Sequence, residues 1–497
     1  MVASRDDAGN VNAPEETNRP IGVREAVGLL VLCDLASGFT QGYYTPLIPA
    51  IAERTDVSDA SVIWFMTVQT LAAAVFVPLL SKLGDMFGHR LLLRIAVSTV
   101  LIGAVITAIS PWFPLVLVGR VMMGPIAVWM PLEVAIIHSR ATGDTARKSV
   151  GLLISIMTGG AILGTLAAGA IGTFSSNLTL TLLVPTLFIA GALFAVFFKV
   201  PGSRLRSDEP VDIVGFVGLA AGMILLLSGL RTASNGSFVG AAAVALLGGA
   251  VLVLGFWIWW ELRAKHPAVD VRLVVSKNLG PLYLTGFLFG MIMFGIQAPL
   301  TTFLSAAPAE VGYGFAGTAT VTSTVLATTT VLATVGAATF SRVARLIGMR
   351  GVLVSGALMA ALGALFIVFF HTDLWQVYVY AGVSGLGMGF LLGGLPALVA
   401  ELAPSGGTGI ATGVYNSLRT LGGATAGAVF AMVLSWFTPL DGDFATLRGY
   451  LVLFIISAGA FGVSAVALAL APIPREAAER AAETEFIELE DVGQAEV

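Results

Sequence analysis

The chain has 497 residues, of which only 11% are charged, against about 25% in an ordinary soluble domain. Hydrophobic residues make up 57%, and glycine occurs 58 times. This composition excludes an ordinary soluble enzyme and indicates a polytopic membrane protein, in which small residues let helices approach closely. The net charge of −4 reflects the end of the chain, because residues 473–497 carry −6 and the remainder +2.

The first 20 residues are polar and acidic, and they lack the basic segment and small-residue cleavage site of a signal peptide. The first helix is therefore expected to stay in the membrane. The single cysteine, Cys33, lies in an apolar run, which excludes an intramolecular disulfide and a cysteine-cluster metal site.

A bilayer core about 30 Å thick requires about 20 apolar residues per helix. Apolar runs of that length, separated by polar, proline or glycine residues, occur fourteen times. In chain order they lie near 26–48, 60–81, 91–109, 114–137, 151–173, 179–198, 213–231, 238–260, 280–302, 317–340, 352–370, 377–400, 409–434 and 449–471. The sequence thus predicts an all-α polytopic membrane protein with 14 transmembrane helices.

Basic residues set the orientation of these spans. The loops after the second, fourth, sixth, eighth and tenth spans contain 16 Lys or Arg, whereas the opposite loops contain three, Arg54, Arg231 and Arg448. Lys and Arg are enriched in cytoplasmic loops. We therefore expect a multi-pass protein of the plasma (inner) membrane with both termini in the cytoplasm.

An internal repeat divides the chain. Three short patterns recur in the same order at offsets of 260–265 residues: 88–90 at 348–350, 131–135 at 396–400, and 159–164 at 422–427. The repeat relates the first six spans to the last six in parallel orientation, as in transporters that rock about a site at the midplane. The expected organisation is a cytoplasmic tail (1–25), a six-helix bundle (26–198), loops with an inserted helix pair (199–279), a second six-helix bundle (280–471) and an acidic cytoplasmic tail (472–497).

The loop after the second span carries a family resemblance. Residues 81–90 read S-K-L-G-D-M-F-G-H-R. They resemble the signature loop of the major facilitator superfamily, G-x-L-A-D-R-x-G-R-R/K, in which Asp85, Gly88 and Arg90 match. Residues 120–124 are similar to the superfamily's R-x-x-Q-G element, and 160–169 to its antiporter motif G-x-x-x-G-P-x-x-G-G, with Thr165 in place of proline. The resemblance implies the major facilitator fold, two parallel-related six-helix bundles, here with two inserted helices.

Two further stretches, 261–273 and 416–423, resemble the fourteen-helix drug:proton antiporter branch. That resemblance implies a secondary active transporter that exports amphipathic small molecules in exchange for protons by alternating access. The branch often has an aspartate in its first helix at the position of Thr40. Here the only acid of that span is Asp34, closer to the cytoplasm.

Charges within the predicted spans are the candidates for proton coupling. A charge in mid-membrane costs about 2.5–3.5 kcal/mol, so it is retained mainly where it faces a cavity or a partner. Asp34, Arg120 and Arg419 fit this description, and Asp34 can load and release a proton. The resemblance favours Arg120 as its partner, whereas Arg419 is nearer in depth, and both stay open. Glu133 is expected near the cytoplasmic end of its span, as a helix-end acid or a coupling residue.

The other candidate residues fall into three sets. The resemblance implies a gate at Asp85, Gly88 and Arg90, which fastens the two halves when the site opens outward. Polar contacts within an otherwise apolar cavity are expected from Gln41, Tyr43, Tyr44, Gln297 and Asn416. Close helix packing is expected at the glycines of two equivalent spans, Gly160, Gly164, Gly169, Gly422, Gly423 and Gly427.

Each competing function would require its own sequence features. ATP-driven transport within the chain is excluded, because no G-x-x-x-x-G-K-[ST] phosphate loop is present. A membrane-embedded enzyme would need a cluster of His, Asp or Cys near one helix end, and a scaffold would need no buried charges. The closest alternative is a facilitator of another solute, such as a sugar, organic acid or lipid precursor, which could also transport in the import direction.

The expected partners are a small-molecule substrate, protons and the lipid bilayer. No cofactor, metal or nucleic acid is expected, and the monomer is the expected working unit.

Overall fold

The computed structural model describes residues 27–139, 143–175, 177–198, 212–234, 240–264, 271–403, 408–439 and 444–472, with the single positions 23 and 267. The predicted N-terminal tail apart from Val23, and the acidic tail after Pro472, lie outside the described residues. Within the described residues all regular structure is helical, and no strand occurs.

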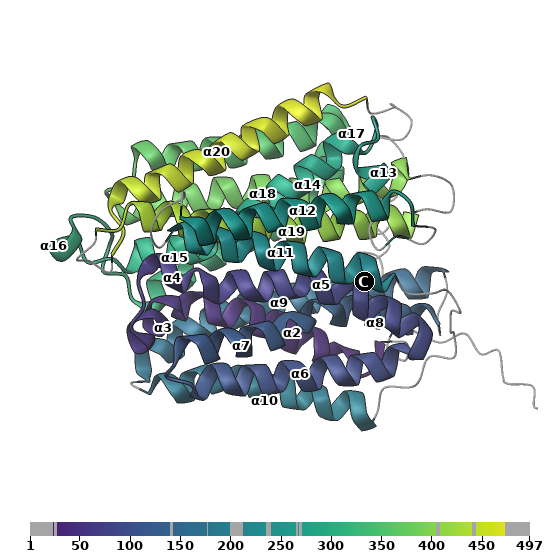
Figure 1. The fold of residues 1–497 in the computed structure, drawn as a ribbon, viewed down its shortest axis with the longest axis horizontal. Helices are drawn as coiled ribbons and strands as arrows, with labels where there is room; N and C mark the ends of the chain where they lie inside the picture. The colour runs from purple at the N-terminus through teal and green to yellow at the C-terminus, as the bar shows by residue number, and fades with distance from the viewer. Residues whose placement is uncertain are drawn as a thin grey trace, which may run out of the picture.

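The N-terminal group of helices occupies the lower half of Figure 1, coloured purple to blue. Its elements are α2 (Leu30–Tyr44), η1 (Thr45–Leu47), α3 (Ile48–Thr55), α4 (Asp59–Val62), α5 (Trp64–Phe87), α6 (His89–Ile109), α7 (Phe113–Met123), η2 (Gly124–Val128), α8 (Trp129–His138), α9 (Gly143–Phe174) and α10 (Leu178–Phe198).

The C-terminal group, coloured teal through green to yellow, forms the upper half (Figure 1). It comprises α14 (Gly280–Gly295), α15 (Gln297–Ser305), α16 (Pro308–Val311), α17 (Ala319–Phe369), α18 (Leu374–Leu402), α19 (Thr408–Trp436) and α20 (Leu447–Leu470). Between the groups in sequence lie α11 (Ile213–Ser234), α12 (Ala241–Glu261) and the short α13 (Val271–Val274).

Prolines interrupt two of the predicted spans. Pro46 lies in η1 and Pro125 in η2, each within a short 3₁₀ segment between two α-helices. A proline lacks the N–H that an α-helix needs and its ring crowds the preceding turn, so the chain tightens locally into 3₁₀ geometry. The first span therefore consists of α2 and α3, and the fourth of α7 and α8.

Two glycines mark an equivalent turn in each group. Gly88 follows α5 with a φ of 102°, and Gly348 lies within α17 with a φ of 78°. Side-chain-bearing residues rarely adopt this left-handed region. Two residues later, Arg90 donates to a backbone carbonyl at the end of α10, and Arg350 to one just after α20. A cation is favoured at the carbonyl end of a helix, which explains why each arginine binds there. The repeated sequence 88–90 and 348–350 therefore has the same local structure in both groups, a left-handed glycine followed by an arginine that binds a helix end.

The contacts between helices separate the two groups. In the N-terminal group α2 packs on α9 and α10, and α6 on α7 and α10; in the C-terminal group α14 packs on α19 and α20, and α17 on α18 and α20. The groups meet where α9 contacts α17 and where α5 contacts α19. Helices α11 and α12 pack on each other, and α11 also contacts α19.

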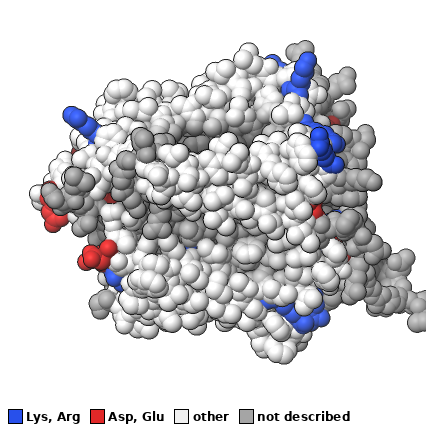
Figure 2. Space-filling model, in the orientation of Figure 1, with Lys and Arg blue, Asp and Glu red and all other residues white. Residues whose placement is uncertain are grey.

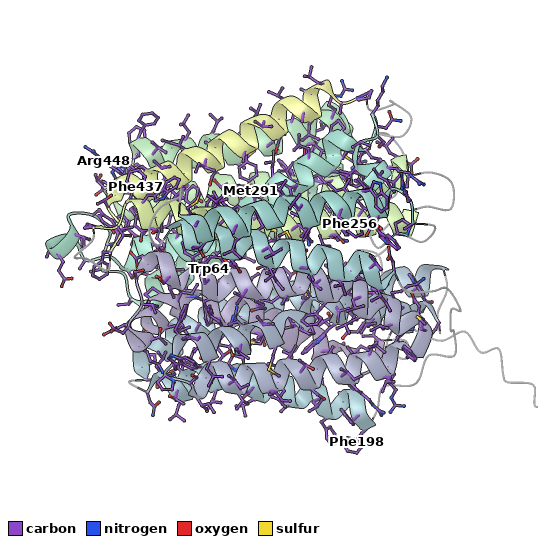
Figure 3. The ribbon with its side chains drawn as sticks, in the orientation of Figure 1. Trp64, Phe198, Phe256, Met291, Phe437 and Arg448 are labelled. Carbon is purple, nitrogen blue, oxygen red and sulfur yellow. The ribbon has the colours of Figure 1, made fainter. Side chains whose placement is uncertain are left out.

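Twelve helices among the described residues are long and apolar enough to cross a membrane. On the face shown in Figure 2, Lys, Arg, Asp and Glu gather at the two ends of the helices and leave an uncharged flank between them. Figure 3 places Arg448, near the start of α20, and Phe198, at the end of α10, at opposite ends of the molecule. This distribution is that of a protein whose helices run side by side across a bilayer.

Candidate functional site

A cavity of about 1400 Å³ lies between the two groups of helices. Its walls come from α2, α5, α7 and α9 on one side and from α14, α17, α18 and α19 on the other. Most of the lining is apolar, and five methionines contribute to it: Met66, Met130, Met157, Met293 and Met388. Of the polar residues predicted from the sequence, Gln41, Gln297 and Asn416 line the cavity.

The other two polar candidates lie outside the cavity lining. The hydroxyl of Tyr43 donates to the Thr181 carbonyl at 2.9 Å, and that of Tyr44 to the Leu182 carbonyl at 3.4 Å. Both acceptors belong to α10, and both tyrosine side chains are buried. Tyr43 and Tyr44 therefore fasten α2 to α10, with their hydroxyls turned to another helix of the same group.

One end of the cavity is bordered by residues of segments that the sequence assigns to the cytoplasm. Ser81 and Lys82 come from the end of α5, and Asp212, Pro267 and Arg272 from the segments around α11 and α13. The cavity therefore extends toward the predicted cytoplasmic end of the molecule.

The opposite end is closed by hydrogen bonds between the two groups. Tyr450 of α20 donates to Oδ2 of Asp59 in α4 at 2.7 Å, and both residues are buried. The hydroxyl of Tyr450 also lies 2.8 Å from that of Thr302. At a second contact between the groups, the hydroxyls of Thr173 in α9 and Thr320 in α17 lie 2.6 Å apart. We call the contacts of Tyr450 with Asp59 and of Thr173 with Thr320 the external closure, because their helix ends are predicted to face outward.

Arg120 of α7 lies in the wall of the cavity and is 2% exposed. Its Nε donates to the Phe65 carbonyl at 3.0 Å, and its terminal nitrogens lie 3.7 Å and 3.3 Å from the sulfurs of Met123 and Met66. The guanidinium also lies over the rings of Tyr44 and Phe65. Among the described residues, Arg120 thus contacts a carbonyl, two thioethers and two rings, and no carboxylate.

Arg419 faces the same cavity from the C-terminal group, on α19. Its guanidinium carbon lies 6.0 Å from the centre of the Tyr415 ring. The Nε of Arg419 is buried and has no hydrogen-bond partner among the described residues. Each group of helices therefore contributes one arginine to the cavity.

Asp34 does not contact either arginine in this structure and lies instead beside a second acid, Glu133. Asp34 of α2 and Glu133 of α8 are both fully buried, and neither lines the cavity. Their carboxyl groups interact electrostatically with each other and with the thiol of Cys33. No described group outside this cluster of Cys33, Asp34 and Glu133 forms a hydrogen bond with the four carboxyl oxygens. The structure thus brings Asp34 together with a second acid.

The predicted gate residues lie around the left-handed turn at Gly88. Oδ1 of Asp85 lies 3.0 Å from Nε2 of His89, and the Asp85 side chain is half exposed. Arg90 points elsewhere, to the Phe197 carbonyl at 2.9 Å. In this conformation Asp85 therefore pairs with His89 across the turn.

The predicted packing glycines occupy two kinds of contact. A Cβ at Gly160 or Gly164 of α9 would overlap the backbone of α2, and one at Gly422 or Gly423 of α19 would overlap α14. The last glycine of each set instead meets the other group: Gly169 faces Ser323 and Thr320 of α17, and Gly427 faces Thr67 of α5. Absent side chains thus allow close approach both within each group and between the groups.

Sequence comparison places this architecture in a family. The sequence matches the profile of the Major Facilitator Superfamily over residues 30–427, most of the chain. The chain belongs to the major facilitator superfamily. It is therefore a multi-pass membrane transporter, and its relatives in this superfamily are transporters, not enzymes.

Several curated relatives resemble most of the chain. The multidrug efflux pump LfrA of Mycolicibacterium smegmatis is 26% identical, over 84% of this chain and 82% of its own length. The cephamycin export protein CmcT of Amycolatopsis lactamdurans is 26% identical, over 85% of this chain and 88% of its own. The multidrug transporter mfsC of Aspergillus fumigatus is 25% identical, over 84% and 81%.

Solved structures of superfamily members share the fold. The nucleoside transporter NupG matches 89% of this chain and 98% of its own, with a TM-score of 0.62 and 14% identity. A peptide transporter of the POT family matches 91% and 96%, with a TM-score of 0.65 and 14% identity. At this identity the likeness shows the fold and nothing about the substrate.

The sequence indicated Glu133 without its neighbour, and it did not single out Asp59. Glu133 lies four residues from the end of its predicted span, which suggests an acid that reaches the interface, yet it is fully buried beside Asp34. Asp59 follows Ser58, whose side chain caps α4, so the sequence pattern suggests an ordinary acid in a first helical turn. Its bond to Tyr450, 391 positions away, could not be read from local sequence.

Proposed function

We propose that this chain is a secondary active transporter of the plasma membrane that exports amphipathic small molecules in exchange for protons. The observation that supports this most is the cavity between the two groups of helices, bordered by predicted cytoplasmic segments at one end and sealed by the external closure at the other. A site enclosed between two halves and open on one side is what alternating access requires. The monomer contains the whole site.

The direction of transport rests on the relatives. LfrA and mfsC are named as a multidrug efflux pump and a multidrug transporter, and CmcT as an export protein. Similar length and coverage over both chains support the same direction for this protein. The largely apolar lining with a few amide side chains supports an amphipathic substrate.

For the membrane topology we propose fourteen spans with both termini in the cytoplasm. The helix α17 has 51 residues and a non-helical Gly348 within it, so it supplies two of these spans. The segment α2–η1–α3 supplies one more, although proline divides it into pieces. The bundles at 26–198 and 280–471 then flank the inserted pair α11 and α12.

We assign proton binding to the carboxyl pair of Asp34 and Glu133. Two adjacent buried carboxylates with no cation of the described residues beside them cannot both be ionised, because charge repulsion and lost hydration both oppose it. One proton shared by the pair removes one of the two charges. Movement of α2 relative to α8 during the transport cycle would change this balance and release the proton. Arg120 and Arg419 act from the cavity side, where substrate binds.

The gate assignment follows the loop at Gly88. In the inward-facing conformation Asp85 pairs with His89. We propose that in the outward-facing conformation the Asp85 carboxylate fastens the cytoplasmic ends of the two groups, with Gly88 and Arg90 fixing the turn that presents it.

Transport in proteoliposomes with an imposed pH gradient tests the function. The purified protein should drive the uptake of amphipathic dyes or drugs into vesicles whose lumen is acidic, and collapse of the gradient should stop it. A protein that moves no solute under any gradient would contradict the proposal.

A facilitator of another solute is the second candidate, favoured by Thr165 at the position of the antiporter-motif proline. The Thr165 hydroxyl donates to the Ala161 carbonyl at 2.9 Å and lies 3.2 Å from the Gly42 carbonyl, so α9 and α2 are joined here by a side chain. Gradient-independent equilibration of a sugar or organic acid in the same vesicles would identify this function.

A further inference from the structure

Basic residues outnumber acidic residues in the lining of the cavity. Among the described residues that line it, four are basic and one is acidic: Lys82, Arg120, Arg272 and Arg419 against Asp212. Asp212 lies at the cytoplasmic border, where its Oδ1 accepts from the Trp260 indole at 2.9 Å and from the Gly215 amide at 2.8 Å. Deeper in the cavity the charged lining consists of Arg120 and Arg419.

Arg120 has donors to spare. A guanidinium carries five N–H donors, and here one is used by a carbonyl while the recorded contacts of both terminal nitrogens are thioether sulfurs, which are weak acceptors. One of these sulfurs belongs to Met66, a flexible side chain that itself lines the cavity. A stronger acceptor entering from the cavity can therefore replace the Met66 contact.

Arg419 is also incompletely satisfied. Its Nε is buried with no hydrogen-bond partner among the described residues, and the side chain borders the cavity. Asp34 and Glu133 are buried beside each other and lie outside the cavity lining. A guanidinium that borders an apolar cavity, with no carboxylate of the described residues beside it, is stabilised by an anion that enters the cavity.

We propose that this cavity selects amphiphilic organic anions, carboxylates or sulfonates on an apolar body, with Arg120 and Arg419 as the groups that bind the anionic head. The inference rests on the proposed transport function and names its substrate class. Methionines and aromatic residues such as Phe289 and Phe294 contact the apolar body. A cationic amphiphile meets two guanidinium groups in the same cavity and is repelled.

Equilibrium binding to the purified full chain tests the proposal without any transport step. Three probes share one ring system and differ in charge: naphthylacetate, naphthylacetamide and naphthylmethylamine. Since a hydrogen bond to a charged group contributes more than a neutral one, naphthylacetate should bind at least about tenfold more tightly than the amide. The protonated amine should bind most weakly.

Variants assign the preference to the two arginines. Arg419→Gln and Arg120→Gln should each reduce naphthylacetate affinity about tenfold and leave naphthylacetamide affinity unchanged, and Arg120→Lys should retain part of the preference. Arg94→Gln is the matched control, because Arg94 lies outside the cavity and contacts the Phe197 ring and carbonyl. Arg120→Lys and the less buried Arg419 keep the test valid should Arg120→Gln not fold.

The outcomes separate this inference from the proposed function. Equal binding of the three probes, tighter binding of the amine, or an unchanged preference in folded Arg120 and Arg419 variants would overturn the anion assignment. Proton-driven transport of a cationic dye would then still support export. Conversely, a clear preference for naphthylacetate without transport of any probe under a pH gradient would uphold the binding site and contradict the transport function.

Discussion

Asp34 and Glu133 form a carboxyl pair. Asn and Gln have nearly the same shape as Asp and Glu, so either acid can be replaced by its amide with little change in packing. We expect Asp34→Asn and Glu133→Gln to abolish proton-driven transport while the protein stays folded in the membrane. An amide does not titrate, so each variant keeps a single carboxyl and loses the charge repulsion between two carboxylates by which movement of α2 relative to α8 would release the shared proton. Transport into proteoliposomes with an acidic lumen measures the loss.

Glu310→Gln provides the matched control, because Glu310 is an exposed acid of the short helix α16. It should transport at the parent rate. Probe binding without a gradient should persist in all three variants, since neither Asp34 nor Glu133 lines the cavity. Gradient-driven transport by Asp34→Asn at the parent rate would remove this residue from the coupling mechanism.

At single residues, sequence reasoning found the important charges but could not find their neighbours. Asp34, Arg120 and Arg419 were identifiable because a charge inside an apolar run needs a reason to be there. Depth along the helices then suggested an arginine beside Asp34. The structure places Glu133 there instead, because the rotation of α2 and α8 about their own axes decides which side chains meet, and no local pattern in the sequence encodes that rotation.

Helices α4 and α20 are joined in the external closure through Tyr450, and this bond can be removed by deleting one oxygen. A hydrogen bond to a charged group contributes about 1.5–3 kcal/mol, and about 1.4 kcal/mol changes a population ratio tenfold. Tyr450→Phe should therefore raise the outward-open population about tenfold or more. After replacement of Cys33, a cysteine at cavity-lining Thr330 should react faster with an impermeant reagent added outside.

Tyr378→Phe serves as the control for this substitution. The Tyr378 hydroxyl lies 2.6 Å from that of Thr324, and both residues belong to the C-terminal group. Loss of a bond within one group should leave external labelling unchanged. Identical labelling of Tyr450→Phe, Tyr378→Phe and the parent would show that the Asp59 contact does not hold the halves closed.

A substitution in the turn between α5 and α6 should shift the population toward the inward-open conformation, the opposite of Tyr450→Phe. If Asp85 fastens the cytoplasmic ends in the outward-facing conformation, Asp85→Asn should slow turnover and favour the inward-open conformation without loss of substrate binding. The same Thr330 cysteine, labelled from the cytoplasmic side of inside-out vesicles, should react faster. Asp56→Asn is the control, since Asp56 ends α3 in the left-handed conformation that asparagine tolerates. Equal labelling of Asp85→Asn and the parent would refute the gate.

At the level of elements, hydropathy located the helices, and their breaks were harder to place. The run near 26–48 is divided by η1 because of Pro46, and the runs near 317–340 and 352–370 lie in the single element α17, with Gly348 between them. Composition sets how apolar a segment is, whereas a proline or a left-handed glycine sets its direction. The repeated glycines of α9 and α19 were visible in sequence, but only the packing reveals that Gly169 and Gly427 meet the opposite group.

The whole molecule has a polarity that topology reporters can check. A reporter fused after residue 205 and one at the C-terminus should both be cytoplasmic, whereas one near residue 235 should be external. The expectation rests on the excess of basic residues in alternate loops, and it agrees with Phe198 and Arg448 at opposite ends of the molecule in Figure 3. An external C-terminus would contradict the even number of spans.

Charge movement through the whole transport cycle distinguishes the possible substrates. If one proton enters for each monovalent anion that leaves, two positive charges in effect move inward per cycle. An inside-negative potential of about 100 mV contributes about 2.3 kcal/mol for each charge moved, so the potential alone should drive such an exchange strongly. The exchange of a proton for a monovalent cation moves no net charge and should not respond to the potential.

In vesicles with a potassium gradient, valinomycin sets the membrane potential without a pH gradient. The dependence of uptake on this potential then measures the charge moved in each cycle. For protein oriented so that its cytoplasmic side faces the medium, naphthylacetate uptake should accelerate when the lumen is made positive and slow when it is made negative. Naphthylacetamide exchanged for one proton should respond with half the charge dependence, which provides the internal control. Naphthylacetate uptake that ignores the potential would contradict the coupled export of an anion by one proton through the Asp34 and Glu133 pair.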